Sequence, residues 1–512
     1  MRQSRGIAAQ AAPADQHPIP APVDPATVRA IIVGIMLAMF LSALEQTIVA
    51  PALPSIGRSL SDVENLSWVV TAYLLSTTLA TALFGKLSDI YGRRALMLIS
   101  VSVFVLGSVA CALAPTLWTL VAARALQGLG GGGILPLAQT VVADILSPRE
   151  RPLVQSYSSV MFMSASILGP VLGGFLTDYI HWSMIFWINL PLGAAALLMT
   201  NRALKRLPRH ERPHRLDIPG ATLMIAAAIA LLLALSWGGS RYGWVSVQIV
   251  GLVGVSALMW GLFVWRLMTA PEPFIPLTMV GEPVVGAVVT AGFFGIGTII
   301  GLSIFMPLYI ELVLGQSASA AGLVLIAFMA GATIGSLLAG RLLSRLDHYL
   351  RVPLSGLPLG TATLTIFAIW PDGFSVAGVA ALLFFGGLGM GTMYPTTTVL
   401  IQNAVLPHQL GTATGTLNFF RQLGGAIVVA VFGAIVLGGM DVHADAVLER
   451  LSDAGGTGSD FADLFRWVFV AAASFLAAAF VAVLCIAERP LRGPAVRSPP
   501  TPGSRERPAA NH

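Results

Sequence analysis

Residues 85–94 read GKLSDIYGRR and close an apolar stretch that begins near Leu66. About twenty apolar residues are enough to cross a lipid bilayer as a helix. The decapeptide that ends the stretch is basic and rich in turn-forming residues, which is typical of a short loop between two membrane spans on the cytoplasmic side. The rest of the chain has to fit around this hairpin of two spans.

The composition is that of an integral membrane protein. Of 512 residues, 56% are hydrophobic and 10% are charged, whereas soluble domains carry about 25% charged residues. A net charge of +5 would suggest nucleic-acid binding in a soluble chain. Here the basic residues fall in loops, where they attract anionic lipid and set the orientation in the membrane. We therefore expect a lipid bilayer as partner and no nucleic acid.

Apolar runs of about 18 residues or more predict fourteen spans, which begin near Val28, Leu66, Ala95, Leu117, Leu153, Ser183, Ile218, Ser246, Val284, Ala320, Val352, Val376, Gly411 and Leu464. An even number of spans places both termini on one side. Most of the 29 Lys and Arg residues fall in the loops and tails that share the side of residues 85–94. Because basic loops stay inside, we expect a multi-pass protein of the cytoplasmic membrane with both termini in the cytoplasm.

An internal repeat divides the spans into two halves. Gly85-Lys86-Leu87 corresponds to Gly340-Arg341-Leu342, and Pro136 corresponds to Pro395. Two parallel repeats with a site between them describe a rocking transporter. The predicted units are a disordered cytoplasmic tail, a six-helix bundle, a basic loop, an inserted helix pair, a second six-helix bundle and a second disordered tail, over residues 1–27, 28–202, 203–217, 218–268, 283–487 and 488–512.

The decapeptide fits in full the signature G-x-L-x-D-x-x-G-R-[RK], and the chain resembles the major facilitator superfamily, in particular its fourteen-span drug:proton antiporters. The resemblance covers nearly all of residues 28–487. It implies an all-α membrane protein with 14 transmembrane helices in two six-helix bundles plus an inserted helix pair. It also implies a gating role for Gly85, Asp89, Gly92, Arg93 and Arg94.

Physical chemistry gives these loop residues separate tasks. Gly85 permits close helix approach, and Asp89 can accept hydrogen bonds from a helix N-terminus or an Arg. Arg93 and Arg94 are expected to anchor at the inner lipid headgroups. The alternative is a basic loop that sets topology without any part in gating.

Two further stretches point to proton coupling. Residues 43–54 are similar to the family stretch L-D-x-T-[IV]-V-x-x-A-L-P, with Glu45 where Asp is usual, and residues 124–132 look like its R-x-x-Q-G-x-G element. At 1.5 Å per residue, Glu45 lies about 24 Å above the inner face and Arg124 about 10 Å below the outer one, so the two can meet. We expect Glu45 to take and release the coupling proton while Arg124 tunes its affinity; the alternative is a static ion pair.

Residues 165–174 resemble the antiporter signature g-x-x-x-G-P-x-x-G-G through Gly169, Pro170, Gly173 and Gly174. Small residues let helices touch, and a proline bends a helix and frees a backbone carbonyl. By resemblance this order favours export over uptake. Glycine-rich packing alone is the alternative.

Polar residues within the spans are candidates for a substrate cavity, namely Gln46, Gln127, Asn189, Glu311, Arg421 and Gln422. Asn189 belongs to a stretch that resembles W-R-W-I-F-x-I-N-x-P-x-G. Glu311 can attract cationic drugs or lie solvated at the interface. Arg421, in an R-Q-x-G-G element, can contact backbone carbonyls or an anionic substrate.

The resemblance implies a proton-coupled exporter of amphipathic toxic compounds, a small-molecule transporter that acts as a monomer. A dedicated exporter of one endogenous metabolite or antibiotic is the alternative, followed by an uptake permease or a non-transporting sensor. No phosphate-binding G-x-x-x-x-G-K-[ST] motif and no His/Cys/acid cluster occurs in the sequence. We therefore expect no enzyme activity, no metal and no cofactor, with the proton gradient as the energy source.

Overall fold

The computed structural model describes residues 25–205, 216–239, 241–438 and 458–488. In that part of the chain the regular structure is helical, apart from one isolated bridge between Gly238 and Tyr242. Most of the two predicted tails and of the basic loop 203–217 lies outside the described ranges. The prediction of a disordered tail is wrong for residues 25–27, because α1 begins at Pro25.

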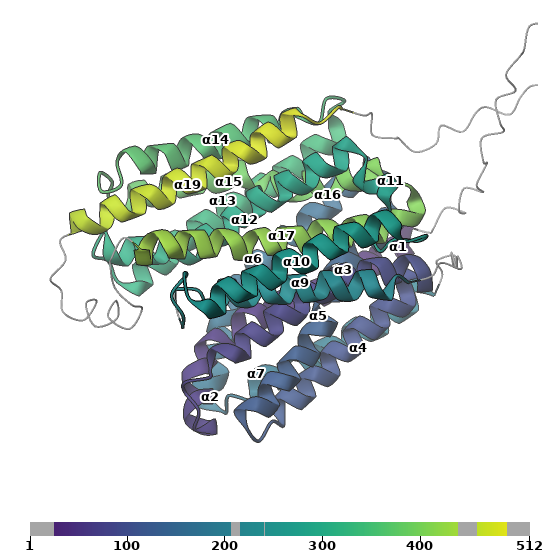
Figure 1. The fold of residues 1–512 in the computed structure, drawn as a ribbon, viewed down its shortest axis with the longest axis horizontal. Coiled ribbons are helices and arrows are strands. Elements are labelled where there is room, and N and C mark those ends of the chain that lie inside the picture. Colours follow the sequence, from purple (N-terminus) through teal and green to yellow (C-terminus); the bar gives the residue numbers. More distant parts are fainter. Residues whose placement is uncertain (1–24, 206–215, 240, 439–457, 489–512) are drawn as a thin grey trace, which may run out of the picture.

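Two bundles and an inserted pair make up the molecule (Figure 1). The first bundle contains α1 (Pro25–Ile48) continued by η1 (Ala50–Ala52) and α2 (Leu53–Leu60), then α3 (Ser67–Tyr91), α4 (Arg93–Ala112), α5 (Leu117–Ile145), α6 (Arg151–Tyr179), and α7 (Met184–Trp187) followed by α8 (Asn189–Leu204). The inserted pair consists of α9 (Ile218–Trp237) and α10 (Val247–Thr269). The second bundle contains the short α11 (Leu277–Val280), α12 (Pro283–Leu312), α13 (Ala318–Arg345), α14 (Arg351–Ile369), α15 (Val376–Gly391) continued by α16 (Met393–Ala404), η2 (Pro407–Gln409) leading into α17 (Leu410–Gly438), and α19 (Gly458–Leu484).

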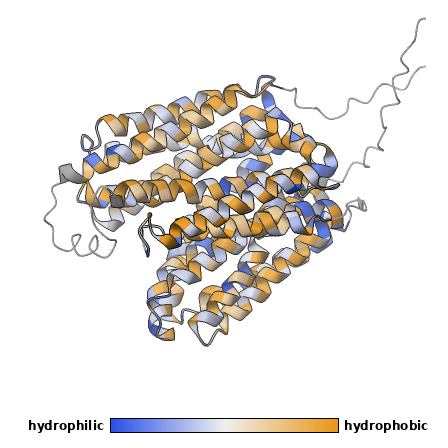
Figure 2. Cartoon of the chain, in the orientation of Figure 1, coloured by the Kyte–Doolittle hydropathy of each residue, from blue (hydrophilic) through white to orange (hydrophobic). Residues whose placement is uncertain are grey.

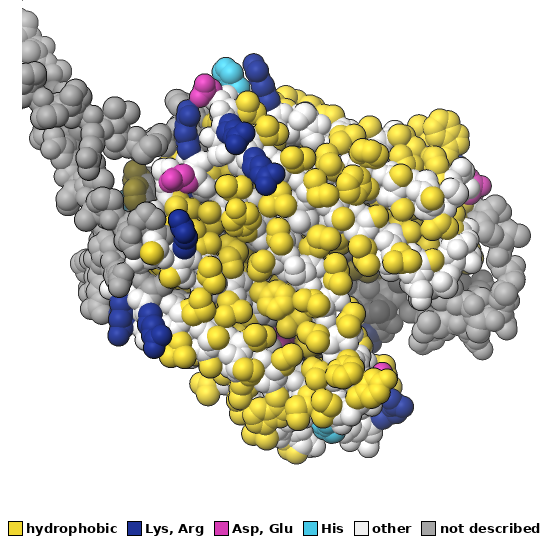
Figure 3. Space-filling view, turned by 180° about the vertical axis from the view of Figure 1, so that it is seen from behind, with side chains coloured by type: hydrophobic (Ala, Val, Ile, Leu, Met, Phe, Trp, Pro, Cys, Tyr) yellow, Lys and Arg dark blue, Asp and Glu magenta, His cyan; other side chains and the backbone are white. Residues whose placement is uncertain are grey.

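The helices suit a membrane, as their colouring by hydropathy shows (Figure 2). Thirteen spans in the described residues are long and apolar enough to cross a bilayer. The fourteenth is α5, which is equally long but carries Arg124, Gln127 and glycines 130–133. Figure 3 shows Lys and Arg side chains gathered mainly at one end, with a hydrophobic flank between the ends. The predicted span starts lie within a few residues of the observed ones, except that α19 begins at Gly458 rather than near Leu464.

Helix starts follow local chemistry. The side chains of Asp217, Ser246, Ser317 and Ser375 each accept a hydrogen bond from the backbone N–H three residues ahead. Such caps satisfy one of the free N–H groups of a first turn and typically contribute about 1 kcal/mol each. Gly92 joins α3 to α4 with φ +87°, a backbone conformation that glycine adopts without strain.

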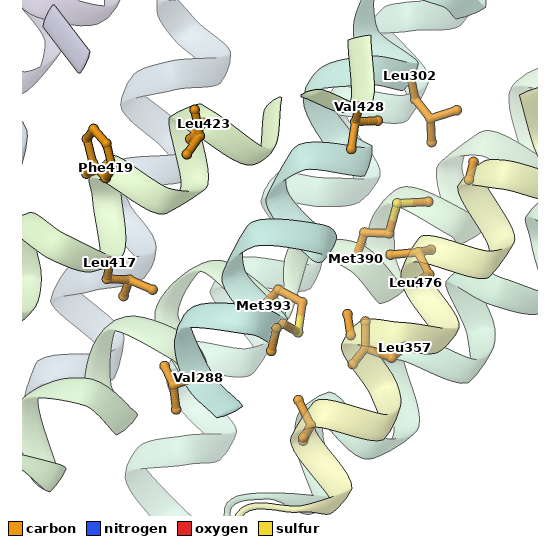
Figure 4. Packing of buried hydrophobic residues seen from close by; sticks show 14 of the residues in the cluster. Val288, Leu302, Leu357, Met390, Met393, Leu417, Phe419, Leu423, Val428 and Leu476 are labelled. Atoms are coloured by element: carbon orange, nitrogen blue, oxygen red, sulfur yellow. The ribbon is translucent and has the colours of Figure 1, made fainter. Parts of the chain in front are cut away.

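The second bundle has a continuous apolar core (Figure 4). Val288 and Leu302 of α12, Met393 of α16, Leu417 of α17 and Leu476 of α19 are fully buried there. Since lipid tails are as apolar as these side chains, close packing rather than escape from water holds membrane helices together.

The inserted pair lies against both bundles. Helix α9 packs on α3 and on α17. The Trp237 ring of α9 lies 5.7 Å from that of Trp68 in α3, and the Trp260 ring of α10 lies 6.3 Å from that of Phe419 in α17. The pair therefore covers the seam between α3 and α17, and leaves uncovered the seam between α6 and α13.

The two bundles are joined at one end, which we call the inner end and define as the end that carries Gly92. The hydrogen bonds between the bundles in the described residues come from the inner halves or the middles of helices, as in those of Asp89 to Thr412 and Ser159 to Ser336. Towards the opposite, outer end, α6 exposes apolar side chains such as Val171 and Phe175. The bundles thus contact each other at the inner end, and their ribbons diverge towards the outer end (Figure 1).

Candidate functional site

Glu45 of α1 and Arg124 of α5 form a salt bridge inside the first bundle. Neither side chain is accessible to solvent, with exposures of 0% and 2%. The contact expected from their depths in the sequence is therefore present. Taking two charges out of water is costly, and only good geometry with further hydrogen bonds offsets that cost.

Those further hydrogen bonds are present. Asn189 Nδ2 donates to Glu45 Oε2 at 2.6 Å, and Arg124 Nη1 also donates to Gln127 Oε1 at 2.6 Å. Arg124 Nε donates to the Val69 carbonyl at 3.1 Å. The Ser108 hydroxyl accepts from both Asn189 and Gln127. Five helices thus converge on one ion pair.

Helix breaks and small residues bring these groups together. Residues 49–52 interrupt the helix just after Glu45, where Pro51 has no N–H to offer the Thr47 carbonyl. Asn189 begins α8 at a second break. A Cβ on Gly107 would lie 2.5 Å from Gln127 Cα, so only glycine lets α4 approach α5 this closely.

Two aromatic rings lie next to the Arg124 guanidinium. The Arg124 guanidinium carbon lies 4.2 Å from the centre of the Tyr73 ring and 5.8 Å from that of Phe186, distances at which a cation is attracted to an aromatic face. Two buried polar atoms beside the ion pair have no hydrogen-bond partner, Tyr73 Oη and Asn189 Oδ1. Asn189 Oδ1 can therefore accept a further hydrogen bond next to the amide nitrogen that donates to Glu45.

The inner latch is a second site, formed by Asp89 of α3 with Gly411 and Thr412 in the first turn of α17. Asp89 accepts hydrogen bonds from both backbone N–H groups, at 2.9 and 2.7 Å, and from the Thr412 hydroxyl at 2.6 Å. A Cβ on Gly85 would lie 2.5 Å from the Gly411 carbonyl oxygen. The expectations of a close approach at Gly85 and of a helix N-terminus at Asp89 are both met.

Arg93 and Arg94, which are expected at the inner lipid headgroups, both have partners inside the protein. Arg93 forms salt bridges with Asp89 at 2.6 Å and with Asp144 at 3.0 Å. Arg94 donates to Asn201 at 2.7 Å. Both side chains thus have acceptors inside the protein, and their contact with lipid headgroups stays a prediction.

Two glycines of the antiporter signature pack against α1, whereas Pro170 and Gly174 do not. Cβ atoms on Gly169 and Gly173 would lie 2.0 Å from Thr47 Oγ1 and 2.3 Å from the Ile48 carbonyl oxygen. Beside Gly174 nothing lies within 4 Å, and Pro170 is exposed within α6. Gly169 and Gly173 therefore hold α6 against the end of α1, next to Glu45.

The residues expected in a substrate cavity do not lie together. Gln127 and Asn189 are fully buried in the Glu45 cluster, so in this conformation they do not line a cavity, because the ion pair uses their amides. Gln46 is exposed on α1 and Glu311 is exposed at the outer end of α12. Gln422 bridges the bundles through hydrogen bonds with Thr78 and Thr81.

Arg421 lies between α17 and α16 and is 3% exposed. Its Nη1 donates to Asn418 Oδ1 at 3.2 Å, and its Nη2 donates to the Tyr394 carbonyl at 3.0 Å and to the hydroxyls of Thr397 and Thr398. No Asp or Glu of the described residues pairs with it. Of the two predicted kinds of contact, the one with a backbone carbonyl is present, and the one with an anionic substrate stays a prediction.

Sequence reasoning missed a polar junction between the bundles. Gln139 of α5 accepts a hydrogen bond from Asn418 Nδ2 at 2.6 Å and donates one to Tyr394 Oη at 3.0 Å. Gln402 Nε2 donates to the Gln139 carbonyl. A buried glutamine one turn after Pro136 is the one signal in the sequence that could have marked this junction.

Comparisons with known proteins agree with this architecture. Residues 35–429 match the Major Facilitator Superfamily. The chain is 32% identical over 410 residues to Multidrug resistance protein 3 of Bacillus subtilis (strain 168), with 80% of each chain covered. It is 31% identical over 406 residues to the Multidrug transporter protein MdtP of the same organism, with 79% of this chain and 75% of the relative covered. The crystal structure of the human organic anion transporter MFSD10 shares the fold, with a TM-score of 0.61 and 18% identity over 88% of this chain and 100% of that chain. The protein therefore belongs to the Major Facilitator Superfamily, and its relatives include transporters of the multidrug type.

Proposed function

We propose that the protein is a secondary active exporter that moves amphipathic toxic compounds out of the cell in exchange for protons. It acts as a monomer in the cytoplasmic membrane, with both termini in the cytoplasm and no cofactor. The observation that carries the proposal is the ion pair of Glu45 and Arg124, which is buried in one bundle and surrounded by amides. The multidrug names of two relatives support the substrate class.

Protonation of Glu45 is the step that drives the exchange. A neutral carboxyl group no longer balances the Arg124 charge, and an unbalanced buried charge costs about 3–5 kcal/mol. The first bundle must then rearrange α1 against α5 or take up a cationic group in place of the lost partner. A proton and a cationic substrate that compete for one carboxylate cannot be bound together, which makes the exchange obligatory.

The arrangement of the bundles fits an outward-facing state of the transport cycle. With the inner latch formed and the outer ends apart, the inner end is cytoplasmic on the proposed orientation and the molecule faces outwards. Glu45 is fully buried in this arrangement, so a proton from outside reaches it only when the first bundle opens locally, and the inner latch must break before the site faces inwards. Since a ligand shifts such an equilibrium only through its different affinity for the two states, protonation and substrate must favour opposite states.

The test is transport by purified protein in liposomes, with a fluorescent amphipathic cation as substrate and an internal pH indicator. A pH gradient should drive dye movement by the wild type, and dye should drive proton movement. Glu45→Gln should abolish both, and Glu45→Asp should retain part of both. Unchanged coupled transport in Glu45→Gln and Glu45→Ala would overturn the assignment. A panel of compounds tested with and without an uncoupler separates a broad exporter from a dedicated one.

A further inference from the structure

Arg421 carries a buried charge that no acid balances in the described part of the chain. Its hydrogen-bond acceptors are the neutral groups of Asn418, Thr397 and Thr398 and one backbone carbonyl. The other deeply buried arginine, Arg124, has a carboxylate partner. A guanidinium near the middle of a membrane costs about 2.5–3.5 kcal/mol or more unless a partner or a cavity compensates it. Neutral oxygens accept hydrogen bonds from its N–H groups but supply no negative charge to balance the guanidinium.

One N–H of Arg421 is left over. Its Nε has no hydrogen-bond partner although the side chain is buried. It lies beside Gly292 of α12, where even a Cβ would come only within 3.6 Å of Nε. No side chain of α12 therefore covers this donor at that position, and an acceptor oxygen of an anion could approach it once the bundle opens.

The first bundle covers the remaining donors of this cluster. Asn418 Nδ2 is taken by Gln139 Oε1, and the Tyr394 hydroxyl accepts from Gln139 Nε2. Both contacts cross the boundary between the bundles at the inner end. When the bundles separate there, Gln139 leaves with α5. The Asn418 amide then loses one of its two acceptors and keeps the Thr414 carbonyl at 2.9 Å. The Tyr394 hydroxyl loses the donor that it accepts from, and both groups can donate to an anion next to the unbalanced guanidinium.

We propose that this cluster, made of Arg421 with Asn418 and Tyr394, binds a single negatively charged group when the transporter faces inwards. The group is a carboxylate carried by the exported compound or a free small anion, because a guanidinium flanked by an amide and a hydroxyl recognises both. The inference rests on the proposed export function and extends it. It adds zwitterionic compounds to the substrates, with the cationic part at Glu45 and the anionic part at Arg421.

The test compares two dyes and one simple anion. The dyes are a xanthene with a free carboxylate and the ethyl ester of the same xanthene, supplied to proteoliposomes under a pH gradient. The anion is acetate, titrated into detergent-purified protein while the unfolding temperature is followed. The variants are Arg421→Gln, Arg421→Lys and Thr398→Asp. The last places a carboxylate where a hydroxyl now lies 2.9 Å from Arg421 Nη2, so it supplies the missing charge and protects the fold. Gly251→Ala is the control, because nothing lies within 4 Å of its added Cβ.

We expect Arg421→Gln and Thr398→Asp to lower the ratio of acid-dye to ester-dye transport at least tenfold. Arg421→Lys should stay within threefold of the wild type, and Gly251→Ala should match it. Acetate should raise the unfolding temperature of the wild type but not that of Thr398→Asp. An acetate effect without a change in the dye ratio assigns the site to a free anion. An unchanged dye ratio together with an unchanged acetate effect in both variants overturns the proposal. If the wild type moves neither dye but shows the acetate effect, the export function fails and the anion site stands.

Discussion

Asp89 caps a helix of the other bundle: its Oδ2 accepts a hydrogen bond at 2.7 Å from the backbone N–H of Thr412, 323 residues further along the chain. Thr412 lies in the first turn of α17, where the unpaired N–H groups and the helix dipole favour a negative charge. Arg93 holds the same carboxylate from within the first bundle. One side chain thus ties the loop of residues 85–94 to the second bundle.

Replacing Asp89 with Asn should open the inner end. The carboxylate loses its charge and one of its acceptor oxygens, and hydrogen bonds to a charged group contribute about 1.5–3 kcal/mol each. We expect the ratio of inward-facing to outward-facing molecules to rise at least tenfold. The measurement is the labelling rate of Ser159→Cys, a position that is hydrogen-bonded to Ser336 at the closed seam, in a background with the exposed Cys485 replaced by Ser.

Asp347→Asn is the matched control for this prediction. Asp347 also pairs across the bundles, with Arg149 at 2.8 Å, but its side chain is 83% exposed. Exposed pairs contribute about 0–1 kcal/mol, so the labelling rate should change less than fivefold. Equal effects of the two substitutions would show that the buried cap on α17 is no stronger than a surface ion pair.

Two adjacent glycines of the antiporter signature should tolerate alanine very differently. A Cβ on Gly173 would lie 2.3 Å from the Ile48 carbonyl oxygen, whereas Gly174 has nothing within 4 Å. Gly173→Ala must push α6 away from the helix that carries Glu45, so we expect at least a tenfold loss of transport rate. Gly174→Ala should stay within twofold. The comparison is made in proteoliposomes at matched protein content, and a loss of similar size in both would remove packing as the reason for this part of the signature.

The contact between Glu45 and Arg124 could be predicted from the sequence because an α-helix rises by a fixed distance per residue. Glu45 could be counted from Arg29 near the inner face and Arg124 from the outer end of its own span, and at a fixed rise per residue both counts led to a similar depth. The loop signature likewise predicted what Asp89 needs, namely N–H donors at a helix start. These predictions depended on depth along the helix axis, which can be counted in residues from the sequence.

Contacts across the molecule could not be obtained in this way. The hydrogen bond between Gln139 and Asn418 depends on how two bundles rotate and slide against each other, and no local periodicity encodes that. Arg93 was expected at the headgroups because its acid partner Asp144 lies on α5, one helix away in sequence and unmarked by any motif. Asn189 was expected in a cavity because its amide could not be assigned to Glu45 before the break between α7 and α8 was known.

Asn189 should set the pH at which transport is half-maximal. Its Nδ2 donates to the charged form of Glu45 at 2.6 Å, so Asn189→Ala removes a contact that favours that form. Glu45 should then take up its proton at a lower proton concentration, and the pH profile of dye export should move to higher pH by about one to two units for a bond of 1.5–3 kcal/mol. The Asn189→Gln variant, which keeps the amide, should show a smaller displacement. A profile that does not move, or that moves to lower pH, contradicts the role of Asn189.

Measurements of unfolding temperature should distinguish the effect of the Glu45 charge on stability from its effect on transport. Glu45→Gln leaves the Arg124 charge buried without its partner, which should cost about 3–5 kcal/mol and lower the unfolding temperature in detergent by several degrees. The double variant Glu45→Gln with Arg124→Met removes both charges, and a buried ion pair replaced by uncharged groups is often no less stable. We therefore expect the double variant to recover most of the unfolding temperature, measured by intrinsic tryptophan fluorescence, while proton-coupled transport stays absent.

If the double variant is as unstable as the single one, hydrogen bonding by Arg124 to Val69 and Gln127 outweighs the charge balance. If it transports protons, the coupling residue lies elsewhere.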